Sequence, residues 1–286
     1  MTGTRPSASM VHSVVATALT RPGVLNDREG DLAGRLQAGS KAIGLDLASV
    51  NDFAGLAEKV RHNQIRYELE LTFRLLRLFE LEIALFRDYL PTSLARRQRG
   101  LTKPADRLIG LAEFAPEWAG DDEHRCVVRD VLIHECILAA FRGDIERLGG
   151  DMGNAPDSED GCGHAIAATP NSVPAFRGSV VVRSMICDPD QVADVLRDRE
   201  PDLTLIRRES RTAVYQRSSS LGVRVLSTDM GVGELITAVD GRADVRAIAQ
   251  RLMVPDPQLP MLTRAYTQLR DLRVITLAVP GGSVCG

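Results

Sequence analysis

The pattern of apolar residues first indicates a long helix. From Val60 to Leu90 there is neither glycine nor proline, and apolar side chains recur every three or four residues. That spacing predicts one continuous helix, and a second apolar stripe on it is typical of a helix at the centre of a bundle. We expect Pro91 to end the helix, because proline lacks the backbone donor that a helix interior needs.

Further helices are predicted on both sides of it. The acids Asp121 to Glu123 and the glycine pair 149–150 predict a second long helix over residues 121–148. Shorter helices are expected over residues 28–62 and 104–114. The N-terminal half, residues 1–148, is therefore predicted to be an all-α domain.

The pattern then changes to that of a linker followed by strands. Residues 149–176 combine glycine, proline, serine and acids without apolar periodicity, which is typical of a linker. Alternating apolar residues predict a strand over 178–186, and Asp188 is expected to cap a short helix after it. Two further runs predict a hairpin and its third strand: 203–209 paired with 212–218, then 222–228.

The last part of the chain predicts three helices and a short strand. The helices are expected from Asp229 to before Gly241, from a cap at Asp244 onward, and over 260–272; the strand is expected over 274–279. The fold class is accordingly α+β, with an N-terminal all-α helical domain followed by a winged-helix-like domain over residues 177–286.

Two glycines in the first turns of the helix after Asp229 are unusual for a helix. Gly231 and Gly233 each cost roughly 1 kcal/mol relative to alanine there. Either the helix starts later than the pattern indicates, or a close packing contact requires the glycines.

Composition and charge narrow the class of protein. The net charge of −3 provides no global basic field that would draw the chain to nucleic acid. The N-terminal residues are too short and too polar a run for a secretory signal, and no apolar run approaches the length of a membrane span. Five cysteines without paired spacing indicate reduced thiols, so we expect a cytoplasmic protein with no membrane partner.

Several stretches resemble a known family. VRVLST, GELITAVDGRADVRAIAQRL and LTRAYTQLRDLRVITL resemble the PqqD-like peptide-recognition domains of pathways that make ribosomal, post-translationally modified peptides. VVVRSMICDPDQVADVLR and HRCVVRDVLIHECILAAFR are similar to segments of the two-domain partner proteins of multinuclear non-haem iron-dependent oxidative enzymes. The resemblance covers the chain from about residue 50 onward.

This resemblance implies a non-catalytic partner protein without a cofactor of its own. Its PqqD-type domain, residues 177–286, would bind the leader of a precursor peptide, expected to contain cysteine, as an extra strand. The helical domain, residues 1–148, would dock the iron enzyme. The implied peptide-binding residues are an edge of Val223, Arg224, Val225 and Leu226, an apolar wall of Leu262, Tyr266 and Leu269, and the basic residues Arg270 and Arg273.

Two other classes of protein stay open. A DNA-binding regulator would use a third helix bearing Arg264, Arg270 and Arg273, but residues 177–286 carry 15 basic against 13 acidic residues, which makes nucleic acid an unlikely partner. An enzyme with an unrecognised site is the other alternative.

Metal-ligating and nucleophilic residues give no defensible site. His124 and His134 would stand about 15 Å apart on one helix and cannot share an ion. Asp130 and His134, four residues apart, are read as a surface ion pair, and Cys136 is read as a small core residue. We therefore assign no catalytic and no metal-binding residue.

Two further segments carry functional hypotheses that are less favoured than a purely structural interpretation. ARRQRG, residues 95–100, is interpreted as a solvated basic loop, with enzyme docking through Arg96, Arg97 and Arg99 as the less favoured reading. The C-terminal PGGSVCG carries Cys285, which could mimic a cysteine-bearing substrate, although an unstructured end is the favoured reading.

Overall fold

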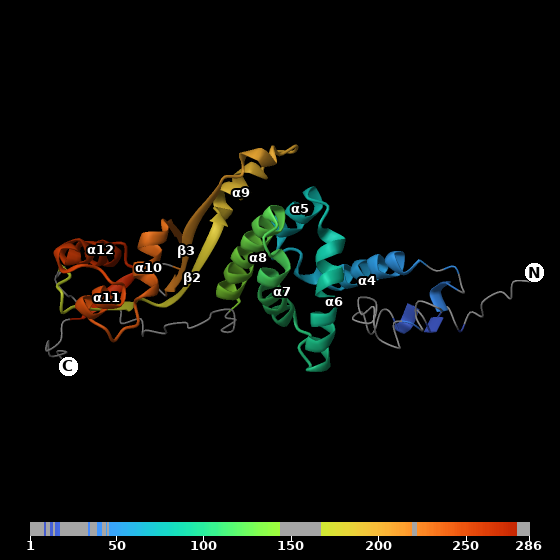
Figure 1. Ribbon diagram of the computed structural model, residues 1–286, viewed down its shortest axis with the longest axis horizontal. Coiled ribbons are helices and arrows are strands. Elements are labelled where there is room, and N and C mark those ends of the chain that lie inside the picture. The colour runs from blue at the N-terminus through green and yellow to red at the C-terminus, as the bar shows by residue number, and fades with distance from the viewer. Residues whose placement is uncertain are drawn as a thin grey trace, which may run out of the picture. The chain divides into compact units, whose positions relative to one another are not determined.

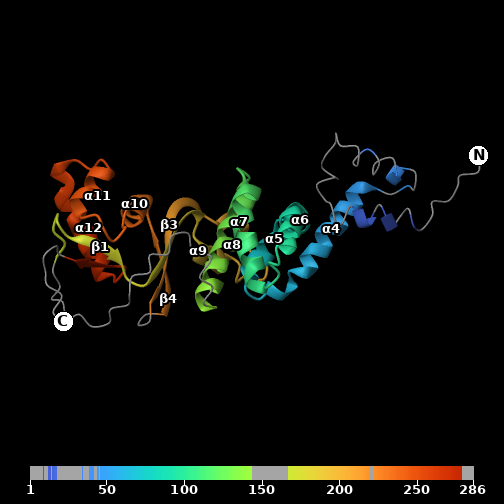
Figure 2. The same cartoon turned by 90° about the horizontal axis from the view of Figure 1, so that it is seen from below.

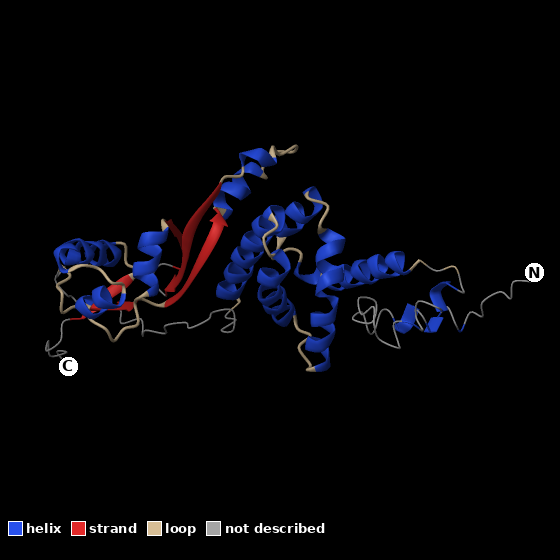
Figure 3. Cartoon of the chain, viewed as in Figure 1, coloured by secondary structure: helices blue, strands red, loops and turns tan. Residues whose placement is uncertain are grey.

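The chain combines helices with two small antiparallel sheets, as the α+β expectation requires (Figure 3). The computed structural model describes residues 46–143, 167–218 and 222–278, together with separate positions between residues 9 and 44. It divides into two compact units, residues 1–136 and 137–286. The tail with Cys285 and most of residues 28–45, the first part of the segment 28–62 in which shorter helices were expected, lie outside the described residues.

Every described element between residues 46 and 143 is helical (Figure 1). Asp46 caps the first of them, because its carboxylate accepts from the N–H groups of Ala48 and Ser49 at 3.1 and 3.2 Å. Helices α4 and α7 both pack on α6. The elements are α4 (Leu47–Arg61), the 3-10 helix η1 (Asn63–Ile65), α5 (Glu70–Leu78), α6 (Glu82–Gln98), α7 (Pro104–Ala119) and α8 (Glu123–Arg142).

The prediction of one helix over residues 60–90 is wrong. The chain turns at η1 and again after α5, where Glu80 adopts a φ of 58° in the left-handed region. The Leu81 N–H donates there to the Leu76 carbonyl at 2.7 Å, a bond typical of helix C-termini. Each segment buries an apolar face, so the apolar spacing continues across turns that it cannot reveal.

Pro91 does not end a helix as predicted, but lies inside α6. Its ring removes one backbone hydrogen bond from the helix interior. Buried side chains flank it on both sides, including Tyr89, Leu90 and Ser93. Packing of this face on the neighbouring helices offsets the lost bond, and α6 continues to Gln98.

The second unit contains the strands (Figure 2). Strands β2 (Ser179–Cys187), β3 (Arg208–Ser218) and β4 (Gly222–Thr228) form an antiparallel sheet in that order. Strand β1 (Val173–Phe176) pairs antiparallel with β5 (Ile275–Ala278). The helical elements are α9 (Pro189–Val195), η3 (Leu203–Leu205), α10 (Met230–Thr237), α11 (Val245–Arg251), η4 (Asp256–Gln258) and α12 (Leu259–Asp271).

Two predictions for this unit need correction. Residues 203–209 and 212–218 do not form a hairpin: 208–218 is one strand, and a 3-10 turn capped by Asp202 precedes it. Residues 173–176, predicted to belong to the linker, form β1. This strand is short and contains Pro174, so it shows no alternation; pairing with β5, about 100 residues later in the chain, makes it a strand.

The caps predicted at Asp188 and Asp244 are confirmed, and Asp229 caps the helix that was predicted to begin there. Asp188, Asp229 and Asp244 accept from the N–H groups of Asp190, Val232 and Ala247 at 3.1, 2.8 and 2.7 Å. These bonds begin α9, α10 and α11, because the first N–H groups of a helix have no acceptor within it.

An apolar core joins these elements. Helix α10 packs on β2 and β3, while α12 packs on α11 and β5. Full burial of one large aliphatic side chain stabilises a fold by about 1.5–3 kcal/mol. The largest contributors include Val214, Ile236, Val245, Ile248, Leu262, Tyr266, Leu269 and Ile275.

Helix α10 shows which of its two glycines is required. A Cβ on Gly233 would stand 2.6 Å from the Cβ of Thr212 on β3 and closer still to the threonine hydroxyl. A Cβ on Gly231 would meet only a carboxylate oxygen of Asp229, at 3.4 Å. Close packing on β3 therefore explains Gly233 and not Gly231.

We predict opposite effects of alanine at these positions. Gly233→Ala should lower the free energy of unfolding by about 1–3 kcal/mol, because the methyl group overpacks the contact with Thr212. Gly231→Ala, the matched control, should raise it by up to about 1 kcal/mol through helix propensity. Hydrogen exchange of the β3 amides in the full chain measures the change in this free energy for each variant. Equal stability of the two variants would contradict the packing argument.

Candidate functional site

The predicted peptide-binding edge lies on β4, the last strand of the three-stranded sheet. Arg224 lies opposite Gln216 of β3, and Val225 opposite Tyr215. No other strand among the described residues pairs with the far edge of β4, so part of its backbone keeps free donors and acceptors. The exposed side chains here are those of Val223, which is 37% exposed, and Ser227.

The three residues predicted to form an apolar wall belong to the core. Leu262, Tyr266 and Leu269 of α12 are 5%, 0% and 5% exposed. The Tyr266 hydroxyl also donates to the Leu235 carbonyl at 3.0 Å, which fixes the ring inside the unit. Helical spacing shows that these residues share a face but not whether that face meets solvent, so they provide no accessible wall beside β4.

A buried glutamine beside β4 gathers the backbone around it. The Gln216 amide nitrogen donates to the carbonyls of Arg177 and Arg273, at 2.5 and 3.0 Å, and its oxygen accepts from Arg224 Nε at 2.7 Å. Arg224 also donates to the carbonyl of Leu272, just after α12. Gln216 is only 1% exposed, so its own bonds are partly shielded from water, whereas the bond from Arg224 to Leu272 is exposed.

Three arginines therefore meet at the end of β4. Burial, followed by the nearby charges of Arg273 and Arg177, holds the pKa of Arg224 below its usual range. Neither Arg177 nor Arg273 has an acidic side chain as an ion-pair partner within the part of the chain that the structure describes. The sequence indicated Arg224 and Arg273, but Arg177 was missed because it lies at the expected linker boundary.

Arg270 has a different role from the predicted one. Its guanidinium forms an ion pair with Asp271, the next residue, at 2.5 Å. An acidic peptide residue would have to compete with this neighbour, so Arg270 is a weaker candidate than Arg273.

The residues considered as metal ligands are dispersed. Among described residues, no group of three or more His, Cys, Asp or Glu side chains is placed to hold a metal ion. His124 stacks on Phe79, with ring centroids 4.4 Å apart. Asp130 and His134 were expected to pair at the surface, but both side chains are buried, and the Asp130 carboxylate pairs with Arg129 at 2.7 Å.

Glu135 instead has a structural role. Its carboxylate accepts from the N–H groups of Leu71 and Thr72, both at 2.9 Å, and from the Thr72 hydroxyl at 2.7 Å. A side chain of α8 thus caps the start of α5, more than sixty residues earlier in the chain. Burial raises the pKa of this carboxyl, while the three donors oppose that shift.

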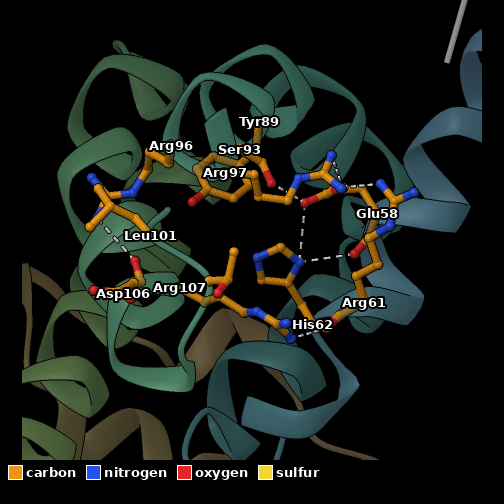
Figure 4. Close-up of a pocket in the computed structure, with 11 residues that line it drawn as sticks. Glu58, Arg61, His62, Tyr89, Ser93, Arg96, Arg97, Leu101, Asp106 and Arg107 are labelled. Atoms are coloured by element: carbon orange, nitrogen blue, oxygen red, sulfur yellow. Dashed lines mark hydrogen bonds and ion pairs between the residues drawn. The ribbon is translucent and has the colours of Figure 1, made fainter. Parts of the chain in front are cut away.

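A second site, missed from the sequence, is a cavity of about 50 Å³ among α4, α6 and α7 (Figure 4). Glu58 is its central acid, although the side chain is only 1% exposed. It accepts from Arg61 at 3.0 Å and from the Ser93 hydroxyl, and Arg97 lies 3.7 Å away. The buried carboxylate is therefore compensated by two cations and a hydroxyl.

His62 lies one helical turn after Glu58 and is 2% exposed. Its Nδ1 lies 2.9 Å from the Glu58 carbonyl, which can only accept, so Nδ1 carries the proton and Nε2 is left as an acceptor. Nε2 has no hydrogen-bond partner among the described residues. The ring packs against Phe86 and Tyr89, and its burial lowers the pKa of His62 below 6.5 despite the nearby Glu58.

The basic cluster at residues 95–100 also borders this cavity and is not the solvated loop that was expected. Arg96 and Arg97 lie in the last turn of α6. Arg96, with 14% of its side chain exposed, donates to Glu113 at 2.6 Å and to the Asp106 carbonyl at 3.0 Å. Arg99 alone of the three arginines is exposed. The sequence did contain a signal for this cavity. Val50, Ala54 and Glu58 follow each other at a spacing of four residues, so an acid lies on the apolar face of α4, where it needs buried partners.

No protein-family model matches the chain, and no curated protein matches it. Among the helices that the structure describes, none has the length and apolar character to cross a membrane.

His62 predicts a pH dependence of the helical unit. Because burial lowers the pKa of His62, this residue is protonated below about pH 6.5 in the unfolded chain but still neutral in the folded chain. The free energy of unfolding therefore decreases as the pH is lowered through this window. The loss should reach at most about 1.4 kcal/mol per pH unit. Urea denaturation followed by the fluorescence of Trp118, the only tryptophan, measures it.

The matched variants are His62→Gln and His124→Gln. The first should flatten the pH dependence between pH 7 and 5, whereas the second, at an exposed histidine, should leave it unchanged. An equal effect of the two substitutions would show that His62 is not the group responsible.

Proposed function

We propose that this chain is a non-catalytic partner protein of a multinuclear non-haem iron-dependent oxidative enzyme in the cytoplasm. Its C-terminal unit would act as a PqqD-like winged-helix domain that binds the leader of a cysteine-containing precursor peptide. The observation that carries the proposal is the strand edge of β4, which has no partner strand among the described residues. Oxidation itself would take place at the partner's iron centre.

Strand addition favours β4 over β2, the other edge of the same sheet. Most residues of β2 are buried or half-buried, whereas Gly222, Val223 and Ser227 of β4 are exposed. A peptide strand beside β4 would gain affinity from main-chain hydrogen bonds. Its side chains would meet the exposed residues of β4 rather than Leu262, Tyr266 and Leu269.

Charge supports a peptide with an acidic residue near the end of α12. The positive charges of Arg177, Arg224 and Arg273 repel one another there, and a carboxylate between them would relieve that repulsion. A bidentate pair with a guanidinium would also fix the register of the added strand.

The helical unit offers an apolar surface for the enzyme. Phe53, Leu56 and Val60 of α4 are 54%, 43% and 57% exposed, and their spacing of three and four residues places them on one stripe. A hollow beside it is lined by Phe53, Leu56, Ile83 and Ala84, and also by the charged residues Asp52, Glu80 and Arg87. Exposed apolar patches of this kind are typical of protein interfaces.

Holding both partners on one chain has a physical advantage. Once the leader is bound, the encounter between the reacting segment and the iron centre becomes intramolecular. Effective concentrations then rise toward the mM range, provided that the connecting peptide spans the distance. Weak recognition of the reacting segment is then sufficient.

Proline substitution tests the peptide edge. Successive residues of β4 direct their backbone N–H groups to opposite edges of the strand. One of the two substitutions Val225→Pro and Leu226→Pro therefore removes a donor from the free edge, and the other removes a donor that bonds to β3. The free-edge variant is the one that keeps the β3 amides protected from hydrogen exchange. It should bind a fluorescent leader peptide, taken from a precursor encoded beside an iron-enzyme gene, at least about tenfold more weakly, roughly 1.4 kcal/mol.

Wild-type affinity in that variant would overturn strand addition at β4. A chain that ignores the peptide but shifts duplex DNA in a salt-sensitive manner would instead support the alternative of a DNA-binding regulator.

Charge on α4 tests enzyme docking. The double substitution Phe53→Glu and Leu56→Glu should abolish co-elution with the co-expressed iron enzyme on size exclusion, since burying two carboxylates in an apolar interface is costly. Met253→Glu, at a side chain that is 88% exposed in the other unit, is the matched control and should co-elute normally. Trp118 fluorescence checks folding, and co-elution of the double variant would rule out this surface.

A further inference from the structure

The cavity among α4, α6 and α7 holds unpaired hydrogen-bonding groups of both kinds (Figure 4). Arg97 contributes two buried donors, Nε and Nη2, that make no hydrogen bond among the described residues, although Nη2 lies 3.7 Å from the Glu58 carboxylate. His62 contributes a buried acceptor, Nε2, and Figure 4 shows its ring directed into the space below Arg97. Leaving such groups unpaired in a buried position is costly, and a ligand with complementary groups would pair them.

The charge of the cavity favours an anion. Several of the side chains already have partners: Arg61 and Glu58 bind each other, and Arg107 donates to the Arg61 carbonyl and to Gln64. Compensation is nevertheless incomplete, because cations outnumber acids even when Glu113, the partner of Arg96, is counted with the acids. The ionisable groups that line the cavity, besides His62 and Tyr89, are Arg61, Arg96, Arg97 and Arg107 against Glu58 and Asp106.

The donors of Arg97 and the acceptor of His62 together restrict which anions can bind. A fully deprotonated anion such as sulfate would pair with Arg97, but it would offer no proton to Nε2 of a neutral His62. A ligand with acceptor oxygens and one O–H satisfies both residues. The cavity of about 50 Å³ is several times the about 10–15 Å³ that one water requires.

We propose that this cavity binds a hydrogen phosphate group, with unprotonated oxygens that accept from Arg97 and a P–OH that donates to His62 Nε2. The site is independent of the peptide edge on β4. Its occupant is either inorganic phosphate or the terminal group of a phosphomonoester. The partly exposed Arg61 and Arg97, at 49% and 32%, give the ligand a route from solvent.

Isothermal titration of the full chain with inorganic phosphate at pH 7.5 and constant ionic strength tests the proposal. We expect saturable binding of one phosphate per chain, and binding of sulfate at least about tenfold weaker, because sulfate lacks the O–H. Titration with phosphate and with glycerol 1-phosphate at pH 6 distinguishes the sources, because about half of a phosphomonoester, whose second pKa is near 6, still carries a P–OH there. Similar affinities identify a phosphomonoester site, and absence of glycerol 1-phosphate binding identifies a site for the free ion.

Arg97→Gln and Arg99→Gln form the matched pair. The first removes charged donors inside the cavity and should weaken phosphate binding at least about tenfold; the second removes an exposed charge two residues later in the same basic cluster and should leave binding unchanged. The proposal is overturned if phosphate does not bind, if sulfate binds equally well, or if the two variants behave alike. The comparison of phosphate with sulfate on the unmodified chain decides the matter even if Arg97→Gln does not fold.

Discussion

The C-terminal unit depends on the side chain of one buried glutamine. Gln216 lies near the end of β3, yet its amide bonds the backbone before β2, the residues after α12 and the guanidinium of Arg224 on β4. Without this amide the carbonyls of Arg177 and Arg273 would lose a donor, which costs about as much as a lost hydrogen bond. The same bonds fix Arg177, Arg224 and Arg273 close together, so the amide that closes the fold also concentrates positive charge beside the sheet edge.

The helical unit is organised by buried carboxylates in a comparable way. Glu135 caps α5 from α8, and Glu58 joins residues of α4 and α6. A charge removed from water is stable only where donors surround it, so each acid restricts the positions of the helices that supply those donors. The turns at η1 and Glu80, which divide the expected long helix, allow the chain to bring those donors to the acids.

The two units differ in which chemical groups remain available for binding a partner. In the C-terminal unit the apolar side chains of α12 are used in the core, and backbone groups of β4 remain available. In the helical unit the backbone is satisfied within helices, and a stripe of large apolar side chains on α4 stays exposed. Backbone edges suit peptides of varied sequence, whereas apolar stripes suit a folded partner, which agrees with the proposed division of labour.

Local signals in the sequence determined much of the fold. Some features depend on neighbouring residues and could be predicted: the caps Asp188 and Asp244, the start of α10 at Asp229, the apolar faces of α8 and α12, and strands β2 and β4. Tertiary structure decided the rest, because the deciding partners lie far apart in the chain: β1 is a strand only through β5, Gly233 is required only by Thr212, and Leu262, Tyr266 and Leu269 share a face that packing alone turned inward. The cavity around Glu58 and His62 belongs to the same group, since periodicity shows which residues share a helix face but not which helix covers it.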